Sequence, residues 1–432
     1  MNSTLFLHMF GLDPDDFDDA IAGPEETEAG WAMSVRQAAG RRECPACHKS
    51  DSVVIKDRYV RRLRHVMPDG SPGTILVERP KLLCRRCSKC FFPPLKGLAP
   101  KARMTSTEEA SLKADLMSML TFAEAARRHG ISEAAAIRAF DRMFPEVPGR
   151  PLPATLCIDE VLFVDRVEGR YPAVLYDWDR RELVDMVRSR QKAWLEEWFS
   201  KKPRWQLENV RFFVSDMYDE YARVRRRFLP NAIHVIDLFH VVKLLSDAVK
   251  RLRANAMNAA ERGSLEYSFM KSRWRLFQIR ESRIPGKYYE HRATGEVLSC
   301  REAVLRCVKS SRALWDAWDI LQELYRWNRN EDFASALAFV ERIAGRLESS
   351  GSPLLSKVGA TYRRWRVEIA NGFARTQTGR RFSNGVAEGL NNRIKTLKKI
   401  SNGCLSFDRF RRRVLLILTY SKPETKKGKG TA

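Results

Sequence analysis

Alternating apolar and polar residues mark the middle of the chain, between residues 154 and 240, as a mixed α/β region. Five runs rich in β-branched and aromatic residues predict strands, and two stretches with apolar residues three and four positions apart predict helices. In chain order these are three strands, a helix, a strand, a helix and a strand, which is the order of an RNase H-like sheet. The predicted strands cover residues 155–165, 171–176, 182–187, 210–215 and 232–236, and the helices cover 190–201 and 218–228.

The first of these strands contains two adjacent carboxylates, Asp159 and Glu160, within an otherwise buryable run. A strand can hold a carboxylate rigidly at the edge of a sheet, as metal-dependent phosphoryl-transfer sites require. The alternative is a strand edge whose acids face water. In an RNase H-like order this strand lies beside the one that ends at Asp216, and acids at the ends of adjacent strands meet at one edge. We therefore expect Asp159 and Asp216 to share a site.

Helical periodicity precedes this region, over residues 107–144. One stretch has the shape of a helix-turn-helix, with Gly130 in the turn and Ser132 capping the second helix. Arg138 and Arg142 lie one turn apart on that helix and could reach DNA. A purely structural helical hairpin has the same pattern, and both interpretations remain open at this point.

Residues 238–365 are mostly helical in pattern and rich in Arg and Trp, which predicts a long insertion rather than a loop. The chain then returns with a helix that Ser383 or Asn384 can cap. Its predicted core face comprises Val386, Leu390, Ile394, Leu397 and Ile400. The opposite face groups Glu388 with Asn391, Asn392, Lys395 and Lys399. Such a face suits a phosphodiester and a metal, although a solvated helix face is the commoner case.

Charge adds a partner to this picture. The 432 residues carry a formal net charge of +24, with 77 Lys and Arg against 53 Asp and Glu. Residues 1–40 hold eight acids and one base, so the excess lies in the remainder, and a body this basic indicates a polyanion such as nucleic acid. We expect the acidic segment to be a mobile arm or a short helix on the body. No apolar run is long enough to span a bilayer, and we see no signal peptide.

Five of the nine cysteines lie between residues 44 and 90. Cys44 and Cys47 form one C-x-x-C pair, Cys84 and Cys87 form another, and a hairpin pattern around residues 68–70 separates the two pairs. This is the layout of a zinc ribbon, in which four thiolates surround a structural Zn²⁺. Cys90 stands beside the second pair, so the choice between Cys87 and Cys90 stays open.

The patterns predict a multi-domain α/β protein: an N-terminal zinc ribbon and helix-turn-helix, then an RNase H-like core with a mixed sheet, interrupted by a long all-α insertion. The expected segments are an acidic arm (1–40), a zinc-ribbon DNA-binding module (41–98), a helix-turn-helix (105–147), the first part of the core (154–240), the helical insertion (241–370), the last part of the core (371–420) and a basic tail (421–432).

The combination resembles the transposases of the ISL3 insertion-sequence family, in the DDE, RNase H-like group. The resemblance spans roughly residues 44–420 and is carried by CPAC and CRRC, the helix-turn-helix, CIDE, VSDMYDEY, VIDLFHVVK, and SNGVAEGLNNRIKTLKKISNGC followed by SFDRFRRR. The last motif is the most specific. The extra Cys90 and the acidic N-terminus depart from the family pattern.

The resemblance implies roles for particular residues. Asp159 is similar to the first acid, Asp216 to the second and Glu388 to the third, with Asp237 as an alternative second acid. Together the three acids would bind Mg²⁺, or Mn²⁺ in its place. His240 matches the last position of a D-x-x-H pattern and could position a phosphate or leaving group. The expected DNA contacts are Arg138, Arg142, Arg381, Arg393, Lys395 and Lys399.

The function implied is a DNA transposase that binds terminal inverted repeats, cleaves strands and transfers them to target DNA. We expect a homodimer on paired ends, no membrane partner, and a bacterial cytoplasmic, nucleoid-associated location. Two alternatives remain: a non-catalytic DNA-binding repressor derived from a transposase, and an RNase H-like nuclease without strand transfer.

Overall fold

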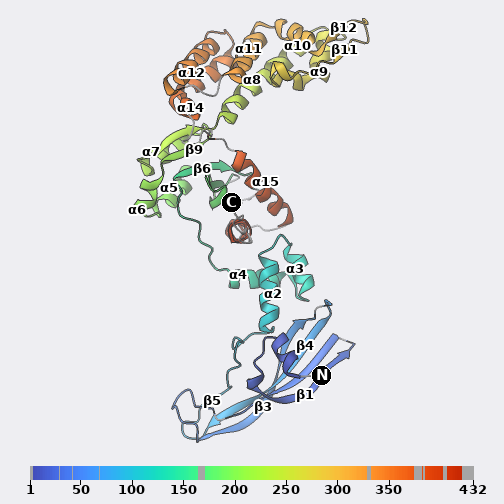
Figure 1. Cartoon of the computed structure of the whole chain (residues 1–432), viewed down its shortest axis with the longest axis vertical. Helices are drawn as coiled ribbons and strands as arrows, with labels where there is room; N and C mark the ends of the chain where they lie inside the picture. Colours follow the sequence, from blue (N-terminus) through green and yellow to red (C-terminus); the bar gives the residue numbers. More distant parts are fainter. Residues whose placement is uncertain are drawn as a thin grey trace, which may run out of the picture. The chain divides into compact units, whose positions relative to one another are not determined.

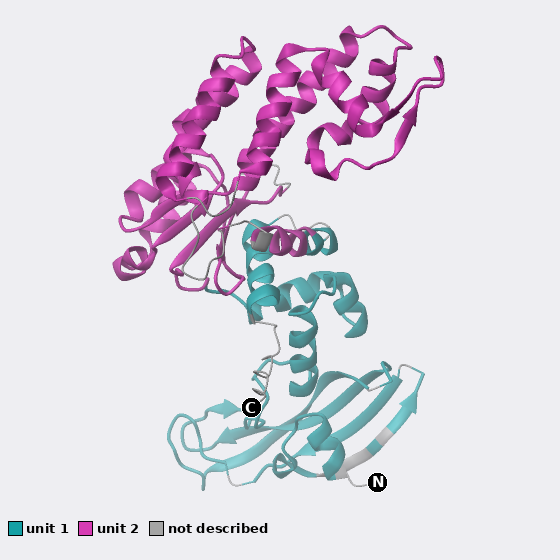
Figure 2. Ribbon diagram, turned by 45° about the horizontal axis from the view of Figure 1, so that its top comes forward, with its two compact units in different colours: residues 1–148, 396–432 teal, residues 149–395 magenta. Residues whose placement is uncertain are grey.

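The computed structural model describes residues 3–28, 30–40, 42–67, 69–163, 171–327, 332–373, 382, 385–401 and 406–420. The chain divides into two compact units, one of residues 1–148 with 396–432 and one of residues 149–395 (Figure 2). Each unit has its own mixed sheet together with helices, so the predicted α/β class is confirmed. Within the described ranges, no helix is both long and apolar enough to cross a membrane.

The first unit begins with a five-stranded sheet of order β1-β2-β4-β3, with β5 paired to β4. β2 and β4 run parallel, whereas the other neighbours are antiparallel. Alternate residues of the strands, such as Val35, Leu63 and Val77, are buried against the N-terminal helix and the loop that contains Leu95. The elements are α1 (Ser3–Met9), η1 (Pro14–Asp16), β1 (Phe17–Thr27), β2 (Gly30–Gln37), β3 (Val53–Val66), β4 (Pro72–Cys84) and β5 (Cys90–Phe91) (Figure 1).

The acidic N-terminal segment belongs to this sheet, so the expectation of an arm over residues 1–40 is wrong. The reason is the alternation on β2, where Met33, Val35 and Gln37 are buried while the intervening residues are not. The acidic strand β1 pairs with β2 along its length. Asp16 is buried, and its carboxylate accepts a hydrogen bond from the backbone N–H of Lys96 at 2.5 Å.

Three short helices follow the sheet: α2 (Ser106–Leu116), α3 (Phe122–Arg128) and α4 (Glu133–Met143). Gly130 turns the chain between α3 and α4 with φ +56°, and the Ser132 hydroxyl caps α4 by accepting from Ala135 N at 3.2 Å. The local prediction of two helices joined by a glycine turn is therefore confirmed. Its role in DNA binding stays a prediction.

The C-terminal helix α16 (Phe407–Leu415) packs in this first unit, followed by a π-helical turn (Leu416–Tyr420). Arg409 and Arg412 donate to the Asp141 carboxylate of α4 at 2.7 and 2.8 Å. Arg413, which is 2% exposed, donates to the Leu120 carbonyl and lies over the Phe122 ring at 4.6 Å. The sequence analysis assigned residues 371–420 to the last part of the core, whereas the arginines of α16 have their partners before α3, on α3 and on α4.

The second unit contains the other five-stranded sheet, of order β10-β9-β6-β7-β8. β6 is antiparallel to β7 and parallel to β9, as predicted, so the strand with Asp159 lies beside the strand that precedes Asp216. β6 ends at Glu160 and is shorter than the predicted strand 155–165. The elements are β6 (Thr155–Glu160), β7 (Ala173–Asp177), β8 (Glu182–Val187), α5 (Lys192–Ser200), α6 (Arg204–Asn209), β9 (Phe212–Ser215), α7 (Asp219–Phe228) and β10 (Ile233–Ile236).

Mostly helical chain follows β10 and has its own apolar core, which includes Leu245, Phe269, Leu321 and Tyr362. One stretch departs from the predicted all-α insertion: β11 (Tyr288–Glu290) and β12 (Val297–Ser299) form a small antiparallel hairpin, with Gly295 at φ +66° in its turn. The helices are α8 (Leu238–Ala259), α9 (Leu265–Ser272), η2 (Trp274–Gln278), η3 (Glu281–Arg283), α10 (Cys300–Lys309), α11 (Arg312–Arg326), α12 (Phe333–Glu348), α13 (Pro353–Arg364) and α14 (Arg366–Phe373).

The last element of the second unit is α15 (Gly385–Ile400), whose final turn is counted with the first unit. Its buried positions Ala387, Leu390, Ile394 and Leu397 follow helical spacing, as predicted for this face. One polar residue, Asn391, is buried among them at 6% exposed. This burial corrects the prediction that placed Asn391 on the exposed face.

Candidate active site and metal-binding cysteines

Asp159 is the penultimate residue of β6, and its side chain contacts α15, which lies more than two hundred residues later in the sequence. The Asn391 side-chain amide on α15 donates to Asp159 Oδ2 at 2.8 Å, and the Asn391 carbonyl oxygen accepts from the Tyr176 hydroxyl on β7. Burial raises the pKa of Asp159 to about 6, and the amide of Asn391 and the charge of Lys395 oppose this rise. The contact fixes the N-terminal half of α15 against β6 and β7.

Asp216 follows the last residue of β9, the parallel neighbour of β6. Burial, together with the negative charges of Glu160 and Asp159, raises the pKa of Asp216 to about 7. Asp216 Oδ1 is buried and has no hydrogen-bond partner within the described part of the chain. The same is true of Glu160 Oε2. Buried carboxylate oxygens without donors fit a hard cation such as Mg²⁺, which takes oxygen ligands.

Glu160 forms an ion pair with an arginine just before the following helix, α5. Arg190 Nη1 lies 2.6 Å from Glu160 Oε1, and its guanidinium lies 4.5 Å from the centre of the Tyr218 ring and 5.0 Å from that of Tyr171. Aromatic rings on two sides therefore hold the arginine in place. Arg190 was not singled out in the sequence, because an arginine at a predicted helix start carries no distinguishing pattern.

His240 and Asp237 lie at the start of α8, directly after β10. The Asp237 carboxylate, 2% exposed, caps the helix by accepting from Phe239 N at 3.1 Å. Burial lowers the pKa of His240, although the negative charges of Asp237 and Glu160 act in the opposite direction. His240 is therefore a neutral imidazole near the same carboxylates. The cap uses only one of the two carboxylate oxygens, so Asp237 as the alternative second acid stays a prediction.

Glu388 is exposed on the first turn of α15. It precedes the buried Asn391 by about one helical turn, so the Asn391 contact brings the first two turns of α15 to β6, while Glu388 itself stays exposed. The basic residues Arg393, Lys395 and Lys399 are exposed on the same helix. Arg381 lies outside the described residues.

The three predicted acids thus occupy elements that contact one another, but their oxygens do not form a closed cluster. Among the described residues, only Cys44, Cys47, Cys84 and Cys87 bring three or more metal-binding atoms within 4.8 Å of one another.

The four cysteines fit a tetrahedral metal. Their Sγ atoms approach to 3.5 Å in the pairs Cys44–Cys87 and Cys47–Cys84, close to the ~3.8 Å edge of a tetrahedron with Zn–S bonds of about 2.3 Å. Backbone hydrogen bonds at Cys87 and Arg86 lower the pKa of Cys84, which favours the thiolate. Cys90 is outside this group, so Cys87 completes it.

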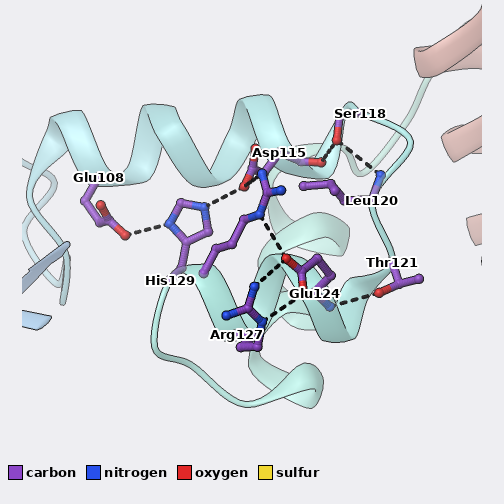
Figure 3. Close-up of polar contacts among 9 residues, drawn as sticks. Glu108, Asp115, Ser118, Leu120, Thr121, Glu124, Arg127 and His129 are labelled. Atoms are coloured by element: carbon purple, nitrogen blue, oxygen red, sulfur yellow. Dashed lines mark hydrogen bonds and ion pairs between the residues drawn. The ribbon is translucent and has the colours of Figure 1, made fainter. Parts of the chain in front are cut away.

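A partly buried ionic cluster joins α2 to α3 and the residue that follows it (Figure 3). His129, which ends α3 and is 3% exposed, lies between two acids of α2: its Nδ1 is 2.6 Å from Glu108 Oε1 and its Nε2 is 3.3 Å from Asp115 Oδ2. Arg138 and Arg142 are exposed on α4, and Arg142 lies 3.3 Å from Glu109. Both arginines are therefore accessible, and their contact with DNA stays a prediction.

Asn391 is the site residue that the sequence analysis misplaced. A signal was present, since Asn391 is four residues after Ala387 and three before Ile394, both on the buried face of α15. A polar residue inside an apolar stripe requires a polar partner, and here the partner is Asp159.

Comparison with protein-family models gives a match over residues 156–414, to the ISL3 family described as a transposase. The matched part is more than half of the chain, and it contains β6 with Asp159, the end of β9 with Asp216, and α15 with Glu388. The chain belongs to the ISL3 family of transposases. No curated protein matches the chain.

As an ISL3-family transposase, the protein acts on DNA, in agreement with its net charge of +24. The family also implies a divalent metal at the reaction centre, which the buried oxygens of Asp216 and Glu160 fit.

Proposed function

We propose that this transposase cleaves and transfers DNA strands with Asp159, Asp216 and Glu388 as metal-binding carboxylates of an RNase H-like core. The sheet order supports this, because three antiparallel strands are followed by two parallel strands on the far side of β6. The hydrogen bond between Asn391 and Asp159 supports it most directly. It brings the segment with the third acid to the strand with the first.

The protein side of the mechanism follows from the contacts. Asn391 and Tyr176 orient the carboxylate of Asp159, and Arg190 fixes one oxygen of Glu160, whose other oxygen is buried without a hydrogen-bond partner among the described residues. Bound Mg²⁺ or Mn²⁺ would supply activation of the attacking oxygen and stabilisation of the leaving one. Burial raises the pKa values of Asp159 and Asp216 because it disfavours their charged forms, which a bound cation would stabilise. Lys395 offers positive charge beside Asp159 for a phosphate.

His240 is a candidate to position the scissile phosphate or its leaving group. Burial lowers the pKa of His240 and so favours its neutral imidazole, which can donate one N–H hydrogen bond without adding a fixed charge. Asp237 orients the first turn of the same helix.

The first unit would bind the element's terminal inverted repeats. Its cysteine group with Zn²⁺ would close the base of the β3–β4 hairpin, and α3 and α4 would act as a helix-turn-helix with Arg138 and Arg142 toward DNA. Further contacts from Arg381, Arg393, Lys395 and Lys399 would hold the cleaved end. Because two ends must be cut together, we propose that the protein acts as a homodimer on paired ends.

The experiment is Mg²⁺-dependent cleavage of duplex DNA that carries the element's own inverted repeats. Asp159→Asn, Asp216→Asn and Glu388→Gln should each lose at least about 100-fold in cleavage rate, since even partners behind the ligands typically contribute 10–100-fold. Asp179→Asn, an exposed acid of the same unit, is the matched control and should cut normally. If the three variants cut as well as wild type, the site assignment is wrong.

The same assay separates the other candidate functions. A repressor would bind the ends without nicking them. A nuclease would nick them without joining the 3′ ends to target DNA. The proposed transposase does both.

A further inference from the structure

The β3–β4 hairpin has one buried side and one exposed side, and the two differ in chemistry. Leu63 pairs with Ile75, and both belong to the buried core of the sheet. Because neighbouring residues of a strand point to opposite sides, Arg62 and Arg64 lie on the other side, opposite Leu76 and Thr74.

The exposed side of the hairpin is basic. Arg58, Val60, Arg62 and Arg64 follow one another at every second position of β3, and Val60 is 62% exposed. Glu78 is the acid opposite Val60, and its carboxylate already pairs with Arg58 at 3.4 Å and with Arg36 of β2 at 3.2 Å. Arg62 and Arg64 are exposed, and across the described ranges neither side chain forms a hydrogen bond or an ion pair.

Protection of a sheet edge does not account for this sign of charge. β3 is an edge strand, and edge strands carry charges that discourage pairing with other chains. Charges of either sign serve that purpose. The opposite edge strand, β1, carries the exposed acids Asp18, Glu25 and Glu26. The sheet therefore has one acidic edge and one basic edge, and the basic one is complementary to a polyanion.

We propose that the exposed side of the β3–β4 hairpin binds the phosphate backbone of duplex DNA through Arg62 and Arg64. The proposal rests on the proposed function, and it names the surface of the first unit that DNA would contact. Residues two apart on a strand are about 6.8 Å apart, so two guanidinium groups can reach two phosphates of one DNA strand. A two-stranded ribbon also fits the ~12 Å width of the major groove. Arg36 and Arg58 would flank the contact while remaining paired with Glu78.

The test measures binding of the full chain to a labelled random-sequence duplex by fluorescence anisotropy, across a salt series and without divalent metal. Each phosphate contact contributes about 0.9 to the slope of log K against log salt, so Arg62→Gln/Arg64→Gln should lower the slope by about 2. The matched control, Arg262→Gln/Arg292→Gln, removes the same charge from exposed sites in the second unit and should change the slope by less than about 0.5. Arg62→Lys/Arg64→Lys keeps the charge and should keep most of the slope.

Unchanged zinc content and thermal unfolding would establish that the variants fold. The proposal is overturned if the hairpin variant and the control have the same slope, or if wild type does not bind the random duplex at all. The outcome is independent of catalysis: if Asp159→Asn cuts normally, the proposed active site fails while the hairpin result stands. If Asp159→Asn is inactive and the hairpin slope is unchanged, only this inference fails.

Discussion

Replacing Asn391 by leucine removes the side chain that joins α15 to β6 and β7. The variant loses the 2.8 Å hydrogen bond to the Asp159 carboxylate, and hydrogen bonds to charged groups contribute about 1.5–3 kcal/mol. It also leaves the hydroxyl of Tyr176, a fully buried residue, without its acceptor, at a cost of about 1–3 kcal/mol. Leucine has a similar volume, so cavity formation adds little. The local free energy of opening should therefore fall by roughly 2.5–6 kcal/mol.

The assay is native-state hydrogen exchange of the β6 and β7 amides, because a chain of two units does not unfold in one step. Tyr176→Phe alone should cost about 0.5–1.5 kcal/mol, and the double variant should cost less than the sum because no orphaned hydroxyl remains. Cleavage should fall in Asn391→Leu, since the Asp159 carboxylate loses the hydrogen bond that joins it to α15. Exchange within about 0.5 kcal/mol of wild type, with additive single effects, would refute the reasoning.

Three further predictions concern the pH and metal dependence of stability. Burial raises the pKa of Asp216 to about 7 in the folded state, against 3.8 when unfolded, so the metal-free second unit should lose stability as pH rises between these two values. Asp216→Asn should flatten this decline in thermal unfolding measured across a pH series. Added Mg²⁺ should oppose the decline in wild type only. Burial lowers the pKa of His129, but the Glu108 hydrogen bond and the charges of Glu108 and Asp115 raise it above 6.5 overall. The stabilisation of α2–α4 by His129 should therefore be complete below pH 6.5 and be lost as pH rises through the folded pKa. His129→Gln should remove this pH dependence from the hydrogen exchange of these helices. Chelation of zinc, or Cys84→Ser, should unfold the β3–β4 hairpin without changing the amide hydrogen exchange of the β6–β10 sheet. If the circular dichroism and the hairpin's protection from exchange are retained after complete metal removal, zinc has no structural role.

The strand order of the second unit could be predicted because each strand is short, β-rich and followed by a clear helix or turn. β6 and β9 pair as the sequence indicated, and Asp159 and Asp216 consequently end neighbouring strands. The cysteine spacing was equally informative, since two C-x-x-C pairs around a hairpin leave few geometries. Local pattern and tertiary structure agree in these places.

Other features depend on partners far away in sequence, and no local pattern reveals them. Residues 1–40 were expected as an acidic arm or a short helix on the body because their charge dominated the interpretation, yet β2 pairs with β4 as a parallel strand. The partners of the α16 arginines are equally distant: Arg409 and Arg412 donate to Asp141, and Arg413 donates to the Leu120 carbonyl. The spacing of Asn391 to Ala387 and Ile394 indicated burial, but its partners Tyr176 and Asp159 lie far away in sequence and could not be predicted from it.

The position of divalent metal in a crystal of the protein with Mn²⁺ and inverted-repeat DNA tests the central assignment most directly. Anomalous scattering locates the ions independently of any activity. The account predicts manganese bound by oxygens of Asp159, Asp216 and Glu388, with Asp237 still capping α8. Manganese bound by Asp237 in place of Asp216, or away from β6 altogether, would contradict it.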